Sequence, residues 1–128
     1  MFAARAYIEK AMFAEALAAT RKVRELSAVG SEPIAYGAYA LAKSGKATET
    51  RAALDELLKL SATRYVPPYH IALIYSGLGE QDKALDYLEK AYEQKDVRMV
   101  FLKVESPWNN LRSTARFIDL VKRMKLES

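Results

Sequence analysis

Histidine, cysteine and clustered carboxylates carry much of protein catalysis and metal binding, and this sequence offers few of them. His70 is the only histidine, and cysteine is absent. A zinc site or a Ser-His-Asp triad needs several such groups at defined spacing, and no carboxylate stands at metal-ligand spacing from His70. We therefore predict no catalytic residue, no metal site and no cofactor, and we expect a chain that is not an enzyme. His70 itself is expected to be a surface residue or a contact to a ligand.

Two glycine-containing stretches bear a partial likeness to phosphate-binding loops. Residues 45–46 match the end of a phosphate loop, but Ala40 stands where that loop needs its first glycine, and Ala47 where it needs Ser or Thr. Residues 77–79 follow no expected strand, although a dinucleotide fingerprint requires one. Both stretches are therefore interpreted as turns between helices.

The composition is that of one folded domain. The chain has 128 residues, of which 51% are hydrophobic and 28% charged, values typical of globular proteins and unlike those of disordered chains. Its length leaves room for one domain, so we assign residues 1–128 to a single domain. Charged residues interrupt the apolar character of residues 1–20. We therefore expect neither a leader peptide nor a membrane span, and we predict a cytoplasmic protein with no membrane partner.

The net charge of +4 is concentrated at the C-terminal end. Residues 97–128 contain seven Lys or Arg and three Asp or Glu, whereas the two kinds balance in residues 1–96. A diffuse excess of this size is typical of a solvated surface and favours solubility. Nucleic-acid contact through the basic C-terminal tail is kept as an alternative hypothesis, which salt-dependent binding to DNA would support.

The sequence repeats itself with a period of 34 residues. At this shift Pro33 aligns with Pro67, and Gly45 aligns with Gly79. Proline suits the first turn of a helix, and glycine can adopt the left-handed conformation that ends one. The pattern therefore predicts helices near residues 33–43, 47–60, 67–77 and 81–94. A further copy, without the opening residues of its first helix, precedes them. The apolar stripe of Phe117, Ile118, Val121 and Met124 predicts a last helix near residues 114–125.

Small residues recur at the positions where paired helices would meet. Ala38 and Ala72 occupy equivalent places in first helices, and Ala84 lies in the second helix of its copy. A small side chain at a helix crossing lets two backbones approach closely. We predict that Ala72 and Ala84 lie where the helices at 67–77 and 81–94 cross.

This pattern resembles the tetratricopeptide repeat family, in which a small residue, an aromatic residue, a turn glycine and further apolar residues recur in fixed order. The residues that carry the resemblance best are Ala72, Tyr75, Gly79, Ala84, Leu88 and Ala91. The resemblance implies an all-α, right-handed helical-repeat solenoid of about three helix-turn-helix units. Their expected bounds are residues 1–30, an incomplete unit, then 31–64 and 65–98. Residues 99–128 are then a connector and a C-terminal capping helix.

The C-terminal segment is similar to the ending that follows such repeats in multidomain bacterial protein kinases, winged-helix regulators and nucleotide cyclases. The matching residues are Val104, Leu111, Arg112, Arg116 and Phe117. The resemblance implies a role in a bacterial signalling or regulatory system. Trp108 is expected to be an apolar plug beneath the capping helix rather than a contact to a partner.

In the tetratricopeptide family, the first helices of successive units line a concave groove that binds proteins or peptides. Carried over by register, the groove residues of this chain are Arg5, Ile8, Glu9, Ala35, Tyr39, Lys43, Tyr69, His70, Leu73 and Ser76. Tyrosine is enriched at binding hot spots, although core filling is an equal alternative for these tyrosines. The groove lacks the basic cluster with which some relatives hold a terminal carboxylate. We predict a scaffold that binds a protein or a peptide.

Self-association is a further alternative. The incomplete first unit leaves apolar residues partly uncovered, among them Phe2, Tyr7, Met12 and Phe13. Contact between two copies is a common way to cover such surface. A molecular size that depends on protein concentration would support this hypothesis.

Overall fold

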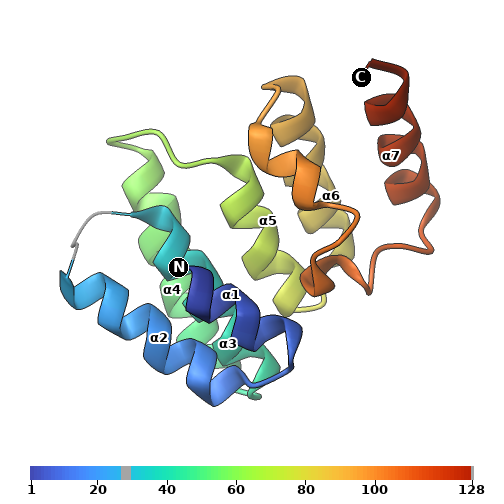
Figure 1. Ribbon diagram of the computed structural model, residues 1–128. Helices are drawn as coiled ribbons and strands as arrows, with labels where there is room; N and C mark the ends of the chain where they lie inside the picture. Colours follow the sequence, from blue (N-terminus) through green and yellow to red (C-terminus); the bar gives the residue numbers. More distant parts are fainter. Residues whose placement is uncertain (27–29, 128) are drawn as a thin grey trace.

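The computed structural model describes residues 1–26 and 30–127, and this part of the chain is helical throughout, without a strand (Figure 1). The first six helices are α1 (Phe2–Glu9), α2 (Phe13–Leu26), α3 (Ser31–Lys43), α4 (Ala47–Ser61), α5 (Pro68–Gly77) and α6 (Gln81–Glu93). They are followed by the 3₁₀-helices η1 (Val97–Phe101) and η2 (Ser106–Trp108) and by the last helix, α7 (Ala115–Glu127). The predicted all-α fold class is confirmed.

The helices predicted from the sequence period are all present, with ends within about two residues of the expected ones. Gly45 and Gly79 follow α3 and α5, and both have φ of 79°. This left-handed conformation suits glycine, which ends helices at such positions, as the sequence predicted. Pro33 lies in the first turn of α3, as expected, whereas Pro67 is the residue just before α5 and Pro68 is the first residue of that helix, where its missing N–H is not needed.

Helices α1, α3 and α5 lie beside one another, and each packs against the helix that follows it in the chain. Helix α2 also packs against α3, and α7 covers α6 at the end of the molecule opposite α1 (Figure 1). Ala72 and Ala84 are completely buried, as expected for small residues where α5 and α6 meet. None of the helices in residues 1–26 and 30–127 combines the length and the apolar character that crossing a bilayer requires.

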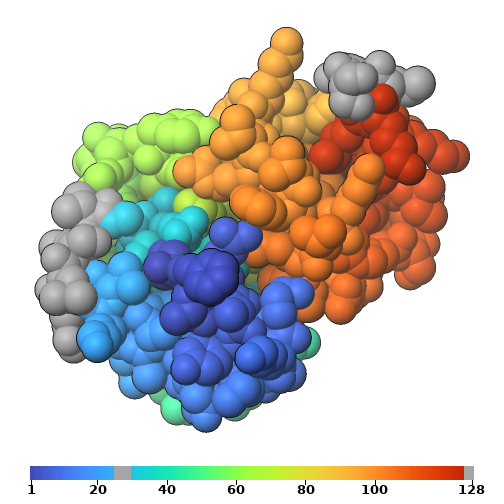
Figure 2. Space-filling view, viewed as in Figure 1, coloured from blue at the N-terminus to red at the C-terminus, as the bar shows by residue number. Residues whose placement is uncertain are grey.

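Beyond α6 the chain runs back across the molecule. Residues 97–112, which we call the return segment, include η1 and η2 and reach the first helix. Figure 2 shows this segment, in orange, against the start of the chain, in dark blue. Its buried side chains are Met99, Leu102, Glu105, Pro107, Trp108 and Leu111. The return segment therefore belongs to the core as much as the helices do.

Candidate functional site

The return segment lies on the faces of α1, α3 and α5. We call these faces the inner surface and define them by Arg5, Glu9, Tyr36, Tyr69 and Ser76, whose side chains bond to the segment. The three helices are those predicted to line a groove. The fold therefore places one strip of chain across three helices that are far apart in sequence.

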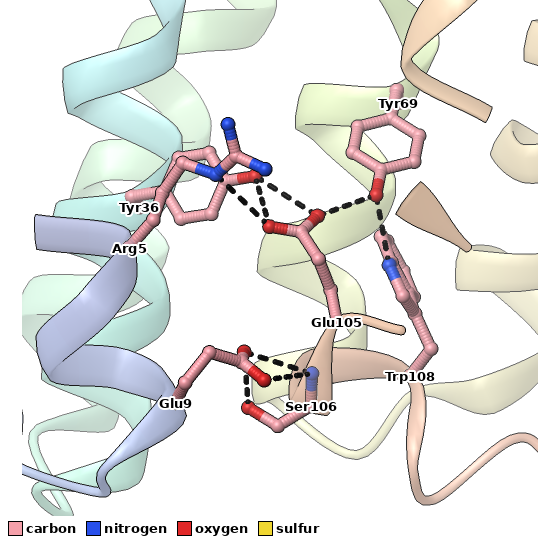
Figure 3. Close-up of polar contacts among 7 residues, drawn as sticks. All are labelled: Arg5, Glu9, Tyr36, Tyr69, Glu105, Ser106 and Trp108. Carbon is pink, nitrogen blue, oxygen red and sulfur yellow. Dashed lines mark hydrogen bonds and ion pairs between the residues drawn. The ribbon is translucent and has the colours of Figure 1, made fainter. Parts of the chain in front are cut away.

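The centre of this contact is the carboxylate of Glu105, which is only 5% exposed. Arg5 donates from Nε at 3.1 Å, and the Tyr36 hydroxyl donates to both oxygens at 3.0 and 3.1 Å. The Tyr69 hydroxyl donates at 2.6 Å (Figure 3). One donor comes from each of α1, α3 and α5. A buried carboxylate is tolerated when it is hydrogen-bonded and paired in this way.

The two tyrosines are held in their neutral form. Burial and the negative charge of Glu105 raise the pKa values of Tyr36 and Tyr69 well above the ordinary phenol value. Both hydroxyls therefore keep their protons and remain donors to Glu105. The geometry therefore suits recognition of a carboxylate by two neutral phenol donors and a guanidinium.

Trp108 contacts the same tyrosine that binds Glu105. Its indole Nε1 donates to the Tyr69 hydroxyl at 2.9 Å, and its ring meets the Tyr69 ring edge to face, with centroids 5.1 Å apart. Trp108 is fully buried, as a plug would be. Tyr69 therefore accepts a hydrogen bond from Trp108 while donating one to Glu105.

The inner surface also holds the main chain of the return segment. The Glu9 carboxylate accepts hydrogen bonds from the Ser106 N–H at 2.9 Å and from the Ser106 hydroxyl at 2.8 Å (Figure 3). The Ser76 hydroxyl donates to the carbonyl of Pro107 at 2.6 Å. These bonds satisfy main-chain groups that lie outside any regular ladder.

Beside the return segment, a hollow of about 500 Å³ remains open on the inner surface. Half of the predicted groove residues line it: Ile8, Glu9, Tyr39, Lys43 and Ser76. Phe13, Ser106, Pro107, Asn109 and Asn110 supply much of the remaining wall. The structure therefore brings these predicted residues together around one concave surface.

The hollow combines an apolar wall with polar groups at its edge. The Phe13 and Tyr39 rings meet edge to face with centroids 6.3 Å apart. Burial, together with the charge of Glu9, raises the pKa of Tyr39 to about 12, so its hydroxyl stays protonated. Lys43 is exposed and forms no ion pair with another described residue. Apolar walls with a few polar groups are typical of ligand-binding sites.

The other predicted groove residues lie elsewhere or are covered. Arg5 and Tyr69 bond to Glu105, whereas Ala35 and Leu73 are completely buried in the core. Tyr39 and Tyr69 are only 4% and 1% exposed. The expectation of an open groove along all the predicted positions is therefore wrong, because the chain's own return segment fills part of it.

His70 is also buried, so the expectation of a surface histidine or a ligand contact is wrong. Its Nδ1 lies 2.7 Å from the Ser31 hydroxyl, and its Nε2 has no partner among the described residues. Burial and the nearby charge of Arg98 lower the pKa of His70 to about 4. Asp96 lies close enough to oppose this shift, but it forms no hydrogen bond to the ring, so the geometry of a catalytic triad is not completed.

Sequence reasoning missed Glu105 and Tyr36 as members of this site. Their partners lie far along the chain, and neither residue belongs to a periodic pattern. The one local signal is a single carboxylate between Val104 and the residues Ser106 and Pro107 that precede a tryptophan. An acidic residue close to Val104, Pro107 and Trp108 is compatible with a buried charge that needs a partner.

The described residues also bear on metal binding and nucleic-acid binding. Across residues 1–26 and 30–127, no three His, Asp or Glu side chains gather closely enough to hold a metal ion. Part of the positive charge of the tail is paired: Arg98 forms an ion pair with Asp96, Arg116 with Asp86 and Glu89, and Arg123 with Asp119. Pairing of this kind lowers the positive potential that a nucleic-acid backbone would meet.

Comparison of the chain with protein-family models, with curated proteins and with solved structures gave no match. The functional assignment therefore rests on the inner surface itself. Its two parts are the covered contact around Glu105 and the open hollow around Tyr39 and Lys43.

Proposed function

We propose that this chain is a protein-binding scaffold of the tetratricopeptide type, and that the hollow beside Tyr39 and Lys43 receives a peptide segment of a partner protein. The role is one of binding and not of catalysis. The resemblance of the C-terminal segment suggests a partner within a bacterial signalling or regulatory system in the cytoplasm.

The arrangement of the helices supports the proposal. Helices α1, α3 and α5 lie side by side, and each is paired with the next helix through a short turn. Stacked helix pairs of this kind make extended concave surfaces that suit protein segments. Gly45 and Gly79 end equivalent helices with the same φ, in agreement with a repeated unit.

The observation that carries the proposal is the strip of chain already lying on the inner surface. Ser76 and Glu9 bond to its main chain, and Arg5, Tyr36 and Tyr69 bond to the side chain of Glu105. A surface that holds one irregular segment by main-chain and side-chain contacts has the features needed to hold another. The hollow continues this surface, because Ser106, Pro107, Asn109 and Asn110 of the return segment form part of its wall.

The hollow suggests the chemistry of its ligand. Phe13 and Ile8 offer apolar contact, and Lys43 offers a cation at the edge. The Asn109 side-chain oxygen accepts a hydrogen bond from Arg112. The NH₂ group of Asn109 is therefore available to donate to a ligand. We infer a ligand segment in which an apolar side chain stands near an acidic one.

The test is selection of peptides from a random display library on the full chain. Selected peptides are then titrated against Lys43→Glu and Phe13→Ala variants, with helicity recorded for each by circular dichroism. Loss of a hot-spot contact typically costs about 2 kcal/mol or more, so binding should fall by more than about tenfold. Lys59→Glu, a charge reversal at an exposed site on α4 outside the hollow, is the matched control.

Selected peptides that bind wild type and Lys59→Glu but not the two hollow variants would support the proposal. Failure to select any peptide would contradict it. Peptides that bind Lys43→Glu and Phe13→Ala as well as wild type would place the binding surface elsewhere.

Self-association is a second candidate function because one apolar surface is open. Phe2 is 88% exposed and, with Phe101 and Val104, lines a hollow of about 410 Å³. Val97 and Val100 are also exposed. Light scattering across protein concentrations tests this candidate: a mass that doubles in wild type but not in Phe2→Ser would favour it, and a constant monomer mass would remove it.

A further inference from the structure

The return segment meets the inner surface as a ligand would. Its carboxylate, from Glu105, bonds to Arg5, Tyr36 and Tyr69 at 2.6 to 3.1 Å, and these three residues stand on three different helices (Figure 3). The donors are already arranged by the packing of α1, α3 and α5. A carboxylate therefore finds a set of fixed donors rather than flexible surface side chains, an arrangement that favours specificity.

The second anchor is Trp108, three residues after Glu105. Its ring is completely buried, and its Nε1 donates to the same Tyr69 hydroxyl that donates to Glu105. Tyr69 therefore contacts both the Glu105 carboxylate and the Trp108 indole. The shared contact fixes the spacing between the two groups.

The inner surface also binds the backbone between Glu105 and Trp108. Glu9 accepts a hydrogen bond from the Ser106 N–H, and Ser76 donates to the Pro107 carbonyl. Just beyond Trp108, Gln81 donates from Nε2 to the Asn110 carbonyl at 2.9 Å. Main-chain bonds of this kind hold a segment whatever its intervening side chains are, so the two anchors supply the selectivity.

We infer that Arg5, Tyr36 and Tyr69 form a recognition site for a segment with a glutamate three residues before a tryptophan, and that the return segment is its built-in ligand. A partner segment with the same spacing competes for the site. This inference rests on the proposed function, because it assumes that the inner surface binds protein segments. It adds a ligand class and a second site next to the open hollow.

The built-in ligand has an advantage over any partner. A tethered segment acts at an effective concentration on the order of millimolar, so a free peptide of equal chemistry is excluded from the wild-type chain. Substitutions at Glu105 and Trp108 weaken the contacts of the tethered segment and so reduce this advantage, while Arg5, Tyr36 and Tyr69 stay in the chain. The site then becomes measurable with a peptide in solution.

The experiment uses the full chain with the paired substitutions Glu105→Gln and Trp108→Phe, which keep the size of the side chains close to the original. The probe is a fluorescent synthetic peptide of residues 102–112, titrated by anisotropy. We expect the variant to bind this peptide at least about tenfold more tightly than wild type does. Peptides carrying either Glu105→Gln or Trp108→Ala should bind the variant at least about tenfold more weakly than the natural peptide.

Stability supplies a second readout if the variant is loosened. A ligand that binds the folded state raises the melting temperature, so the natural peptide should raise that of the variant, and the Glu105→Gln peptide should raise it less. A folded variant that neither binds nor is stabilised by peptide at millimolar concentration would overturn the inference.

Lys43→Glu in the same variant separates this inference from the proposed function. Binding of the 102–112 peptide should survive that change, because Lys43 contacts neither anchor, whereas library peptides that use the open hollow should be lost. Equal binding of the natural and Glu105→Gln peptides would also overturn the inference, since the carboxylate would then carry no recognition.

Discussion

Arg5 and Glu105 are 100 positions apart in the chain, and their side chains form an ion pair with Nε and Oε2 at 3.1 Å. The Arg5 guanidinium also lies over the Phe101 ring, with its central carbon 4.2 Å from the ring centroid. The first helix is therefore fastened to the return segment by charge and by a cation–π contact. Because the pair is mostly buried, it is less screened by salt than a surface ion pair.

Replacing Glu105 should destabilise the fold strongly. Glu105→Ala leaves Arg5 and the Tyr36 and Tyr69 hydroxyls without their shared acceptor in a buried site, and we expect a loss of about 3 kcal/mol. Glu105→Gln keeps one acceptor oxygen and should lose less. Urea denaturation of both variants measures the difference, and equal midpoints for wild type and Glu105→Ala would show that the carboxylate contributes nothing.

Trp108 should be the most sensitive apolar position of the return segment. It is fully buried and bonded to Tyr69, so Trp108→Ala should cost about 3 to 5 kcal/mol through the cavity it leaves. Trp108→Phe retains most of the ring and should cost less. Thermal melting followed by circular dichroism gives both values, and a melting temperature for Trp108→Ala equal to that of wild type would contradict the observed packing.

The helices were predictable because their signals are local and periodic. The 34-residue shift placed Gly45 and Gly79 at helix ends, and glycine has a physical reason to be there. The recurrence of small residues likewise predicted that Ala72 and Ala84 are buried between helices, and both are buried. These features depend on residues close together in the chain, where spacing alone carries the information.

The path of the return segment was not predictable in the same way. Glu105 meets Tyr36 across 69 positions and Tyr69 across 36, and each contact uses a single residue without a period. Register assigned Tyr39 and Lys43 to one surface, and both line the same hollow, but register could not show what else lies on that surface. Tyr69 was therefore assigned to an open groove when it is buried beneath the chain itself.

Overpacking should test the crossing of α5 and α6. Ala72 and Ala84 have no exposed surface, so Ala72→Leu or Ala84→Leu should cost about 1 to 3 kcal/mol in the free energy of unfolding. Ala18→Leu is the matched control, because Ala18 is exposed on α2 and leucine has nearly the helix propensity of alanine. A destabilisation by Ala18→Leu as large as that of the buried variants would argue against a specific crossing.

The buried His70 should make the protein sensitive to mild acid. Its pKa falls from an ordinary value of 6.5 to about 4 in the folded chain because of burial and the charge of Arg98. The unfolded chain therefore binds a proton more readily than the folded one. The stability associated with neutral, buried His70 is therefore fully present above pH 6.5 and is lost as the pH falls from 6.5 toward 4.

The expected loss of stability is about 2 to 3 kcal/mol between pH 7.5 and 4.5. Urea midpoints measured at both values give it directly. His70→Gln supplies the control, because glutamine does not titrate and its amide can still bond to the Ser31 hydroxyl, which lies 2.7 Å from Nδ1 in the wild-type chain. If His70 is responsible, the variant should lose much less stability than wild type over the same pH range. Equal losses in both chains would assign the acid sensitivity to the carboxylates instead.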